Sequence, residues 1–156
     1  MELTVDQALQ QGVAAHKEGK LQRAEQLYRA ILQAEPNHPD ANHNLGLLAV
    51  AAGKPLEAIP LFKLALEANP KIEQFWLSYI DVLITAERFD VAKHVLVEGE
   101  KSGVSSEKLD ALNALIGSHA RISDLRRFDS QENKTEVTYF IDVEDVARCN
   151  VLALEA

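Results

Sequence analysis

The chain has 156 residues, of which 47% are hydrophobic and 26% are charged, a composition typical of a globular domain with a packed core. Its formal net charge of −8 argues against nucleic acid as a partner, because an acidic surface repels phosphate, and its one cysteine, Cys149, rules out an intramolecular disulfide. The sequence has no membrane-spanning apolar stretch, signal peptide or basic run, so we expect a cytoplasmic protein that contacts no membrane.

Apolar residues recur at steps of three and four, which predicts a series of amphipathic helices. The expected helices lie near 4–18, 21–34, 38–52, 55–68, 72–86 and 89–102. They repeat with a period of 34 residues, and we number each period from 1 to 34. The repeats are then 5–38, 39–72 and 73–106.

Several positions recur from one period to the next. Position 8 is Gly12, Gly46 and Ile80; position 15 is Gly19, Gly53 and Glu87; position 20 is Ala24, Ala58 and Ala92; position 24 is Tyr28, Phe62 and Leu96; position 32 is Pro36, Pro70 and Val104. Small residues at positions 8 and 20 allow two antiparallel helices to approach closely. Glycine at position 15 ends the first helix, and proline at position 32 sets the turn into the next period.

This pattern resembles the tetratricopeptide repeat family over residues 4–104. The first and second repeats match strongly, and the second follows the family pattern from Asn44-Leu45-Gly46 to Pro70. The third keeps Trp76, Phe89 and Ala92 but loses both glycines and the proline. The resemblance implies an all-α fold, a right-handed superhelix of antiparallel helix pairs. It also implies a concave face that binds a partner and is lined by the first helix of each pair.

The repeats are followed by segments of different character. Residues 105–119 carry an apolar stripe and predict a capping helix, so we expect one domain at 4–119. Residues 120–135 predict a short helical extension and then a linker. The β-branched and aromatic content after Glu136 predicts a strand-like tail within 136–156.

A lone strand needs a partner, and three alternatives remain for the tail. It pairs with the same segment of a second chain in a homodimer, it docks into a groove, or it is helical instead. The apolar residues expected at an oligomer contact are Val137, Tyr139, Phe140 and Ile141.

No motif for catalysis, phosphate binding or metal coordination is present in the sequence. The five histidines are scattered, and Cys149 has no evident base beside it. We therefore expect a protein that is not an enzyme and that holds neither a metal nor a cofactor.

The resemblance assigns the concave face to defined positions of each repeat. The candidate groove residues are Leu9, Gln10, Val13, His16, Lys17, His43, Asn44, Leu47, Val50, Leu77, Ser78, Asp81 and Ile84. Position 6 reads Gln10, Asn44, Ser78, a polar ladder able to bond a peptide backbone, similar to the ladder of O-linked N-acetylglucosamine transferases. The basic clamp of the chaperone-tail class is missing, since only Asn44 fits it.

The sequence thus predicts a protein-interaction scaffold whose groove binds a peptide or an amphipathic helix of another protein. Two alternatives stay open. The chain resembles bacterial repeat modules found beside glycosyltransferase and methyltransferase domains, which implies an accessory or oligomerisation module. The second alternative is self-assembly, in which the tail of one chain fills the groove of another chain.

Overall fold

The computed structural model describes residues 2–132, with side chains through Arg127, and all of its described secondary structure is helical. The helices are α1 (Val5–Lys17), α2 (Leu21–Ala34), α3 (Pro39–Ala51), α4 (Pro55–Ala68), α5 (Glu73–Thr85), α6 (Phe89–Lys101) and α7 (Ser106–Glu132). The chain consists of two compact units, Met1–Ile116 and Gly117–Ala156.

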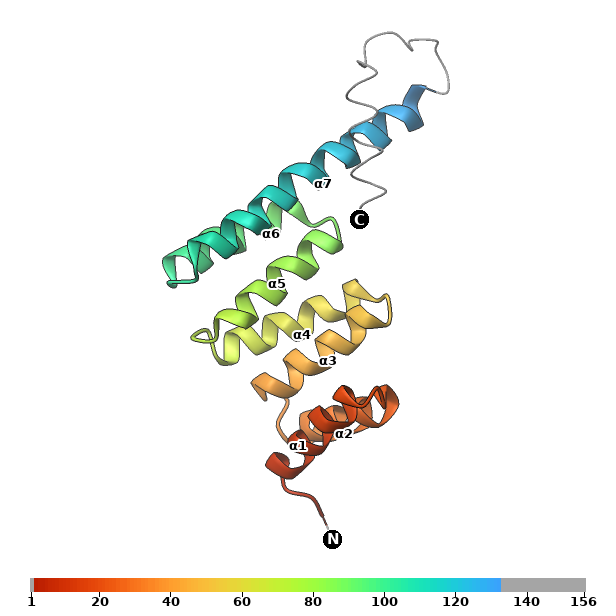
Figure 1. Cartoon of the computed structure of the whole chain (residues 1–156), viewed down its shortest axis with the longest axis vertical. Helices are drawn as coiled ribbons and strands as arrows, with labels where there is room; N and C mark the ends of the chain where they lie inside the picture. The colour runs from red at the N-terminus through yellow and green to blue at the C-terminus, as the bar shows by residue number, and fades with distance from the viewer. Residues whose placement is uncertain (1, 133–156) are drawn as a thin grey trace. The chain divides into compact units, whose positions relative to one another are not determined.

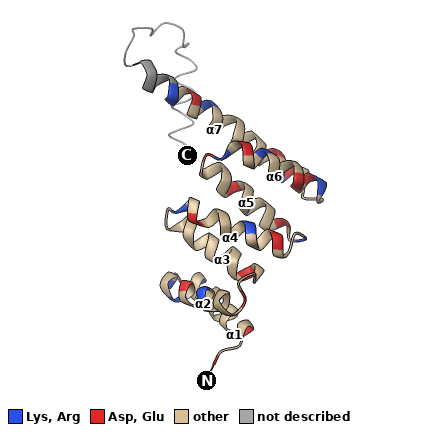
Figure 2. Cartoon of the chain, turned by 180° about the vertical axis from the view of Figure 1, so that it is seen from behind, with Lys and Arg blue, Asp and Glu red and all other residues tan. Residues whose placement is uncertain are grey.

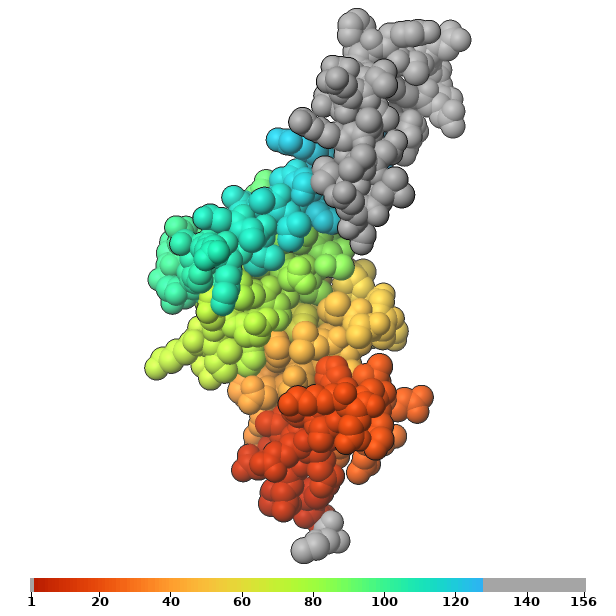
Figure 3. Space-filling view, in the orientation of Figure 1, coloured from red at the N-terminus to blue at the C-terminus, as the bar shows by residue number. Residues whose placement is uncertain are grey.

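Within the first unit, consecutive helices pair, and the pairs stack in chain order (Figure 1). The space-filling view shows the same succession from α1–α2 to α3–α4 to α5–α6 (Figure 3). The predicted all-α fold of helix pairs is therefore confirmed.

The helix starts follow local chemistry. Thr4 opens α1 with a capping box: its hydroxyl accepts from the Gln7 amide N–H at 3.2 Å, and the Gln7 side chain accepts from the Thr4 N–H at 3.1 Å. α3 and α4 both begin with a proline, Pro39 and Pro55, at a position where a missing N–H leaves no bond unmade.

The first helix of every pair ends in the same hydrogen-bonded turn. The Lys20 N–H bonds to the Ala15 carbonyl at 2.8 Å, and equivalent bonds join Lys54 to Ala49 and Arg88 to Leu83. In each turn the preceding residue has a positive φ: 75° at Gly19 and Gly53, and 58° at Glu87. Position 15 therefore adopts the left-handed conformation in all three repeats, including the one that has no glycine there.

The glycines at position 8 allow close contact with the aromatic ring at position 24. A Cβ on Gly12 would lie 2.7 Å from Tyr28 Cε1, and one on Gly46 would lie 2.8 Å from Phe62 Cε1. Both distances are shorter than van der Waals contact, so any larger residue would displace the ring.

Two clusters of buried residues form the core of the first unit. The first joins α1 and α2 to α3, with Tyr28, Ile31 and Leu45 among its members. The second joins α4, α5 and α6 and includes Leu109 and Ile116 of α7, with Leu112 packed beside it. Of the predicted capping stripe, only Leu115 is exposed.

α7 extends further than the sequence predicts, because it continues to Glu132. Most of the stretch at 120–135, which was expected to be a short helical extension followed by a linker, is therefore helical. The strand-like tail at 136–156, with Val137, Tyr139, Phe140 and Ile141, lies outside the described residues. The homodimer contact and the accessory-module alternative that depend on the tail stay predictions.

Candidate functional site

The candidate groove residues lie on α1, α3 and α5, the first helix of each pair, but they differ in exposure. Six are half-buried: Leu9, Val13, His16, Asn44, Val50 and Leu77. Four are exposed: Gln10, Lys17, Leu47 and Asp81. Three are buried: His43, Ser78 and Ile84. The exposed and half-buried residues remain accessible to a partner.

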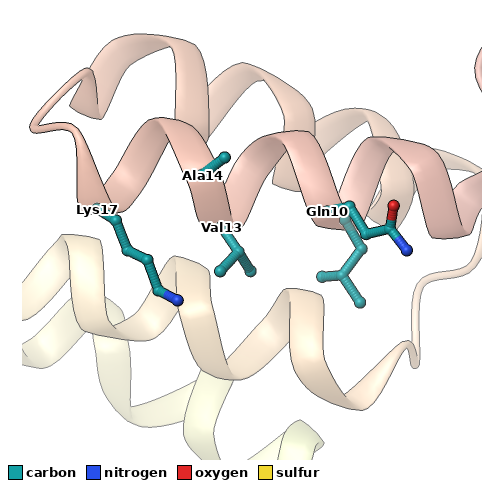
Figure 4. A pocket seen from close by; sticks show the side chains of 5 residues that line it. Gln10, Val13, Ala14 and Lys17 are labelled. Atoms are coloured by element: carbon teal, nitrogen blue, oxygen red, sulfur yellow. The ribbon is translucent and has the colours of Figure 1, made fainter.

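A pocket of about 370 Å³ lies on α1 and is lined by Leu9, Gln10, Val13, Ala14 and Lys17. We call it the α1 pocket. Figure 4 shows Val13 and Lys17 extending from α1 toward the neighbouring ribbon of the next repeat. Four of the five lining residues are candidate groove residues. The fifth, Ala14, lies four residues after Gln10 and three before Lys17, so helical spacing alone would have placed it on the same face.

The polar ladder predicted at position 6 is interrupted in the third repeat. Ser78 Oγ lies 2.9 Å from His43 Nε2 and accepts from the Gln74 amide at 3.1 Å. Ser78 and His43 thus use their polar atoms to join α5 to α3. Gln10 and Asn44 make no side-chain hydrogen bond to another residue of the described part of the chain, so the ladder available to a partner contains these two amides.

The imidazole of His43 is packed between aromatic rings as well as bonded. Its centroid lies 5.4 Å from that of Phe62 and 4.8 Å from that of Phe75. Burial lowers the pKa of His43 below its ordinary value of 6.5, and the Asp40 carboxylate opposes part of that shift. His43 is therefore buried between the second and third repeats, where it supplies packing and a polar contact and offers a ligand little surface.

Charge is sparse along the concave positions. Asp40 is the only Lys, Arg, Asp or Glu in α3, whose ribbon is correspondingly uniform in colour (Figure 2). On α5, loss of surrounding water raises the pKa of the Asp81 carboxyl. Lys17, near the end of α1, is the one Lys or Arg among the candidate groove residues.

Within the described part of the chain, no group of three His, Cys, Asp or Glu side chains is arranged to hold a metal. None of the described helices combines the length and apolar character needed to cross a bilayer. Among the described residues, the remaining shifted pKa values have local causes: burial raises those of Tyr28 and Tyr79, and the hydrogen bond from Lys101 lowers that of Glu98.

Stacked helix pairs with a 34-residue period and a pocket on the first helix define a helical repeat protein of the solenoid class. The family model described as Tetratricopeptide repeat matches residues 9–71 and 43–105. The chain therefore belongs to the tetratricopeptide repeat family, as its sequence pattern indicates. No curated protein matches the sequence.

Solved structures with the same fold include MamA AMB-1, which is 25% identical, with a TM-score of 0.65 over 99% of this chain and 80% of that chain. A MamA mutant is 27% identical, with a TM-score of 0.63, and the match covers 73% of this chain but only 66% of the MamA chain. The TPR2B domain of yeast Sti1, solved in complex with pHsp70, is 16% identical, with a TM-score of 0.65 over 72% of this chain and 95% of that chain. At that identity the last likeness shows the fold alone.

Proposed function

We propose that this protein is a non-catalytic scaffold that binds a peptide segment or an amphipathic helix of another protein along the concave positions of α1, α3 and α5. The observation that carries the proposal is the α1 pocket, because four of its five lining residues lie at concave positions. Solvent-accessible apolar side chains favour an apolar ligand face. The Sti1 TPR2B domain, which has the same fold, was solved as a complex with pHsp70, and this is compatible with the proposal.

Exposed apolar residues beyond the pocket support the same surface. Leu47 lies at position 9 of the second repeat, and 36% of it is exposed. An exposed leucine on an otherwise uncharged stretch of α3 would gain from burial against a ligand. The two amides Gln10 and Asn44 would hold the backbone of that ligand, because each carries a donor and an acceptor.

A matched pair of leucines tests the proposal. Leu47 on α3 and Leu64 on α4 are equally exposed, at 36%, but only Leu47 lies on a groove-lining helix. The full chain would be used to select peptides from a displayed library of random dodecapeptides. We expect Leu47→Asp to weaken binding of the selected peptides about tenfold or more and Leu64→Asp to leave binding unchanged.

Thermal unfolding of both variants controls for folding, since an exposed leucine contributes little to the core. If the library yields no binding peptide, or if Leu64→Asp weakens binding as much as Leu47→Asp, the groove is not the binding surface and the proposal is wrong.

A further inference from the structure

The repeats differ in the polar groups that they offer a ligand at the concave positions. Position 5 is half-buried Leu9 in the first repeat, buried His43 in the second and half-buried Leu77 in the third. Position 6 is exposed Gln10 in the first repeat, whereas Ser78 in the third is buried and bonded to His43. Among the described residues, the polar contact between His43 of α3 and Ser78 of α5 has no equivalent between α1 and α3, and the α1 pocket lies at these positions of α1.

The walls of the α1 pocket are apolar between two polar ends. Leu9, Val13 and Ala14 supply aliphatic surface, and Leu9 and Val13 pack against the core on their inner side. Gln10 and Lys17 are seven residues apart, about 10 Å along the helix axis. A ligand side chain that enters between them would contact aliphatic carbon, while its neighbours along the ligand would reach the amide or the ammonium group.

The charge of Lys17 is available to a ligand. Lys17 is exposed, and it makes no ion pair within the described part of the chain. Lys20, three residues later, is also exposed but is paired with Glu18 at 2.6 Å. The other charged residue in the candidate groove set is an acid, Asp81, and the two charged residues at position 2 of the first two repeats, Asp6 and Asp40, are acids as well. Within the described part of the chain, the α1 pocket thus has a positive charge, Lys17, at one end, while the Asp6 carboxylate lies one helical turn before Gln10 at the other end.

We infer that the α1 pocket recognises a partner segment that carries an aliphatic side chain followed, within about one helical turn, by an aspartate or glutamate. The inference rests on the proposed groove function and adds the chemistry of the ligand to it. The aliphatic side chain displaces water from Leu9, Val13 and Ala14, and the carboxylate pairs with the Lys17 ammonium group. A basic segment is disfavoured, because it would lose water at Lys17 without gaining a partner.

The test uses the same dodecapeptide library on the full chain and reads the sequences that are selected. We expect enrichment of Leu, Ile or Val with Asp or Glu three or four residues away. Lys17→Ala should weaken the selected peptides about threefold to tenfold, and less at high salt, because the interaction is screened. Lys20→Ala removes the same charge from a residue already paired with Glu18 and should have no effect.

Val13→Thr tests the apolar part of the pocket without changing its shape, and it should weaken the same peptides about threefold. Selected peptides that are basic or lack acidic residues, or equal binding by the Lys17→Ala and Lys20→Ala proteins, would overturn the inference. If Leu47→Asp still abolishes binding in that case, the groove function stands and only the recognition chemistry is wrong. If Leu47→Asp has no effect either, both proposals fail.

Discussion

The second and third repeats reach the same backbone geometry with different side chains. In the second repeat, Gly46 at position 8 packs directly against the ring of Phe62 at position 24. In the third, the same positions hold Ile80 and Leu96, both buried. In the third repeat the residue on the first helix is larger and the residue on the second helix is smaller than in the second repeat. The two changes in side-chain volume offset each other, so both helix pairs remain packed.

The two repeats also make an equivalent hydrogen bond with different side chains. Asn42 at position 4 of the second repeat donates to the Pro36 carbonyl at 3.0 Å. Trp76 at position 4 of the third repeat donates to the Pro70 carbonyl at 2.8 Å. Both bonds satisfy the carbonyl of the proline at position 32, where the chain turns into the next repeat. The two repeats therefore share a contact although the residue types differ. Exchanging residues between the repeats tests whether the different residue types are equivalent.

The largest expected effect comes from placing the isoleucine of the third repeat into the second. Gly46→Ile should lower the free energy of unfolding by about 1–3 kcal/mol, because its Cβ alone overlaps the Phe62 ring. Adding Phe62→Leu copies the Ile80–Leu96 pair and should recover part of that loss. Chemical denaturation of the two single variants and the double variant measures the coupling, and simple additivity would show that the two positions do not compensate each other.

A smaller effect, with the opposite sign, is expected at position 15. Glu87 holds the left-handed conformation that glycine adopts in the other repeats. Glu87→Gly should raise the free energy of unfolding by about 1 kcal/mol, since a side chain in this conformation is strained. The reverse exchange, Gly53→Glu, should lower it by a similar amount. A destabilised Glu87→Gly protein would mean that the glutamate side chain makes a compensating contact.

The exchange of Tyr28 for the phenylalanine found at position 24 of the second repeat should also be stabilising. The Tyr28 side chain is fully buried, and its hydroxyl makes no hydrogen bond in the described part of the chain. Tyr28→Phe should raise the free energy of unfolding by about 0.5–1 kcal/mol, because it removes a buried polar atom without a partner. Thermal and chemical unfolding check this, and a loss of stability would indicate a partner for the hydroxyl.

The smallest effect concerns pH and the contact between the second and third repeats. Burial lowers the pKa of His43 in the folded chain below 6.5, so the unfolded chain binds more protons between the two pKa values. The stabilising contribution of neutral His43 is complete above about pH 6.5 and is lost progressively as the pH falls below that value. Denaturation midpoints of the wild-type and His43→Gln proteins from about pH 7.5 to 5.5 should converge, and parallel curves would contradict the assignment.

Much of the fold could be predicted from the sequence because the repeat is local. The 34-residue period, the glycines at position 15 and the prolines that start α3 and α4 all act within a few residues of chain. From α1 to α6, every observed helix end lies within one residue of the expected end. The length of α7 was harder to predict, because its polar C-terminal part carries little apolar periodicity. A capping helix and a short helical extension were expected there, followed by a linker.

The candidate site was predicted less completely. Positions on the concave face follow from helical spacing, and four of them line the α1 pocket. The burial of His43 and Ser78 could not be predicted, because it depends on a hydrogen bond between residues 35 positions apart and on the rings of Phe62 and Phe75. A polar residue at a groove position thus does not reveal whether its partner is a ligand or the next repeat.

By itself the sequence determined the family, the number of repeats and the turns between helices, since these depend on local spacing and on residues that favour particular backbone angles. Only the tertiary structure decided which concave residues remain accessible. Accessibility depends on how neighbouring helices pack: the contact between His43 and Ser78 buries both side chains between α3 and α5, whereas α1 retains a pocket bordered by Lys17, which has no ion pair in the described part of the chain.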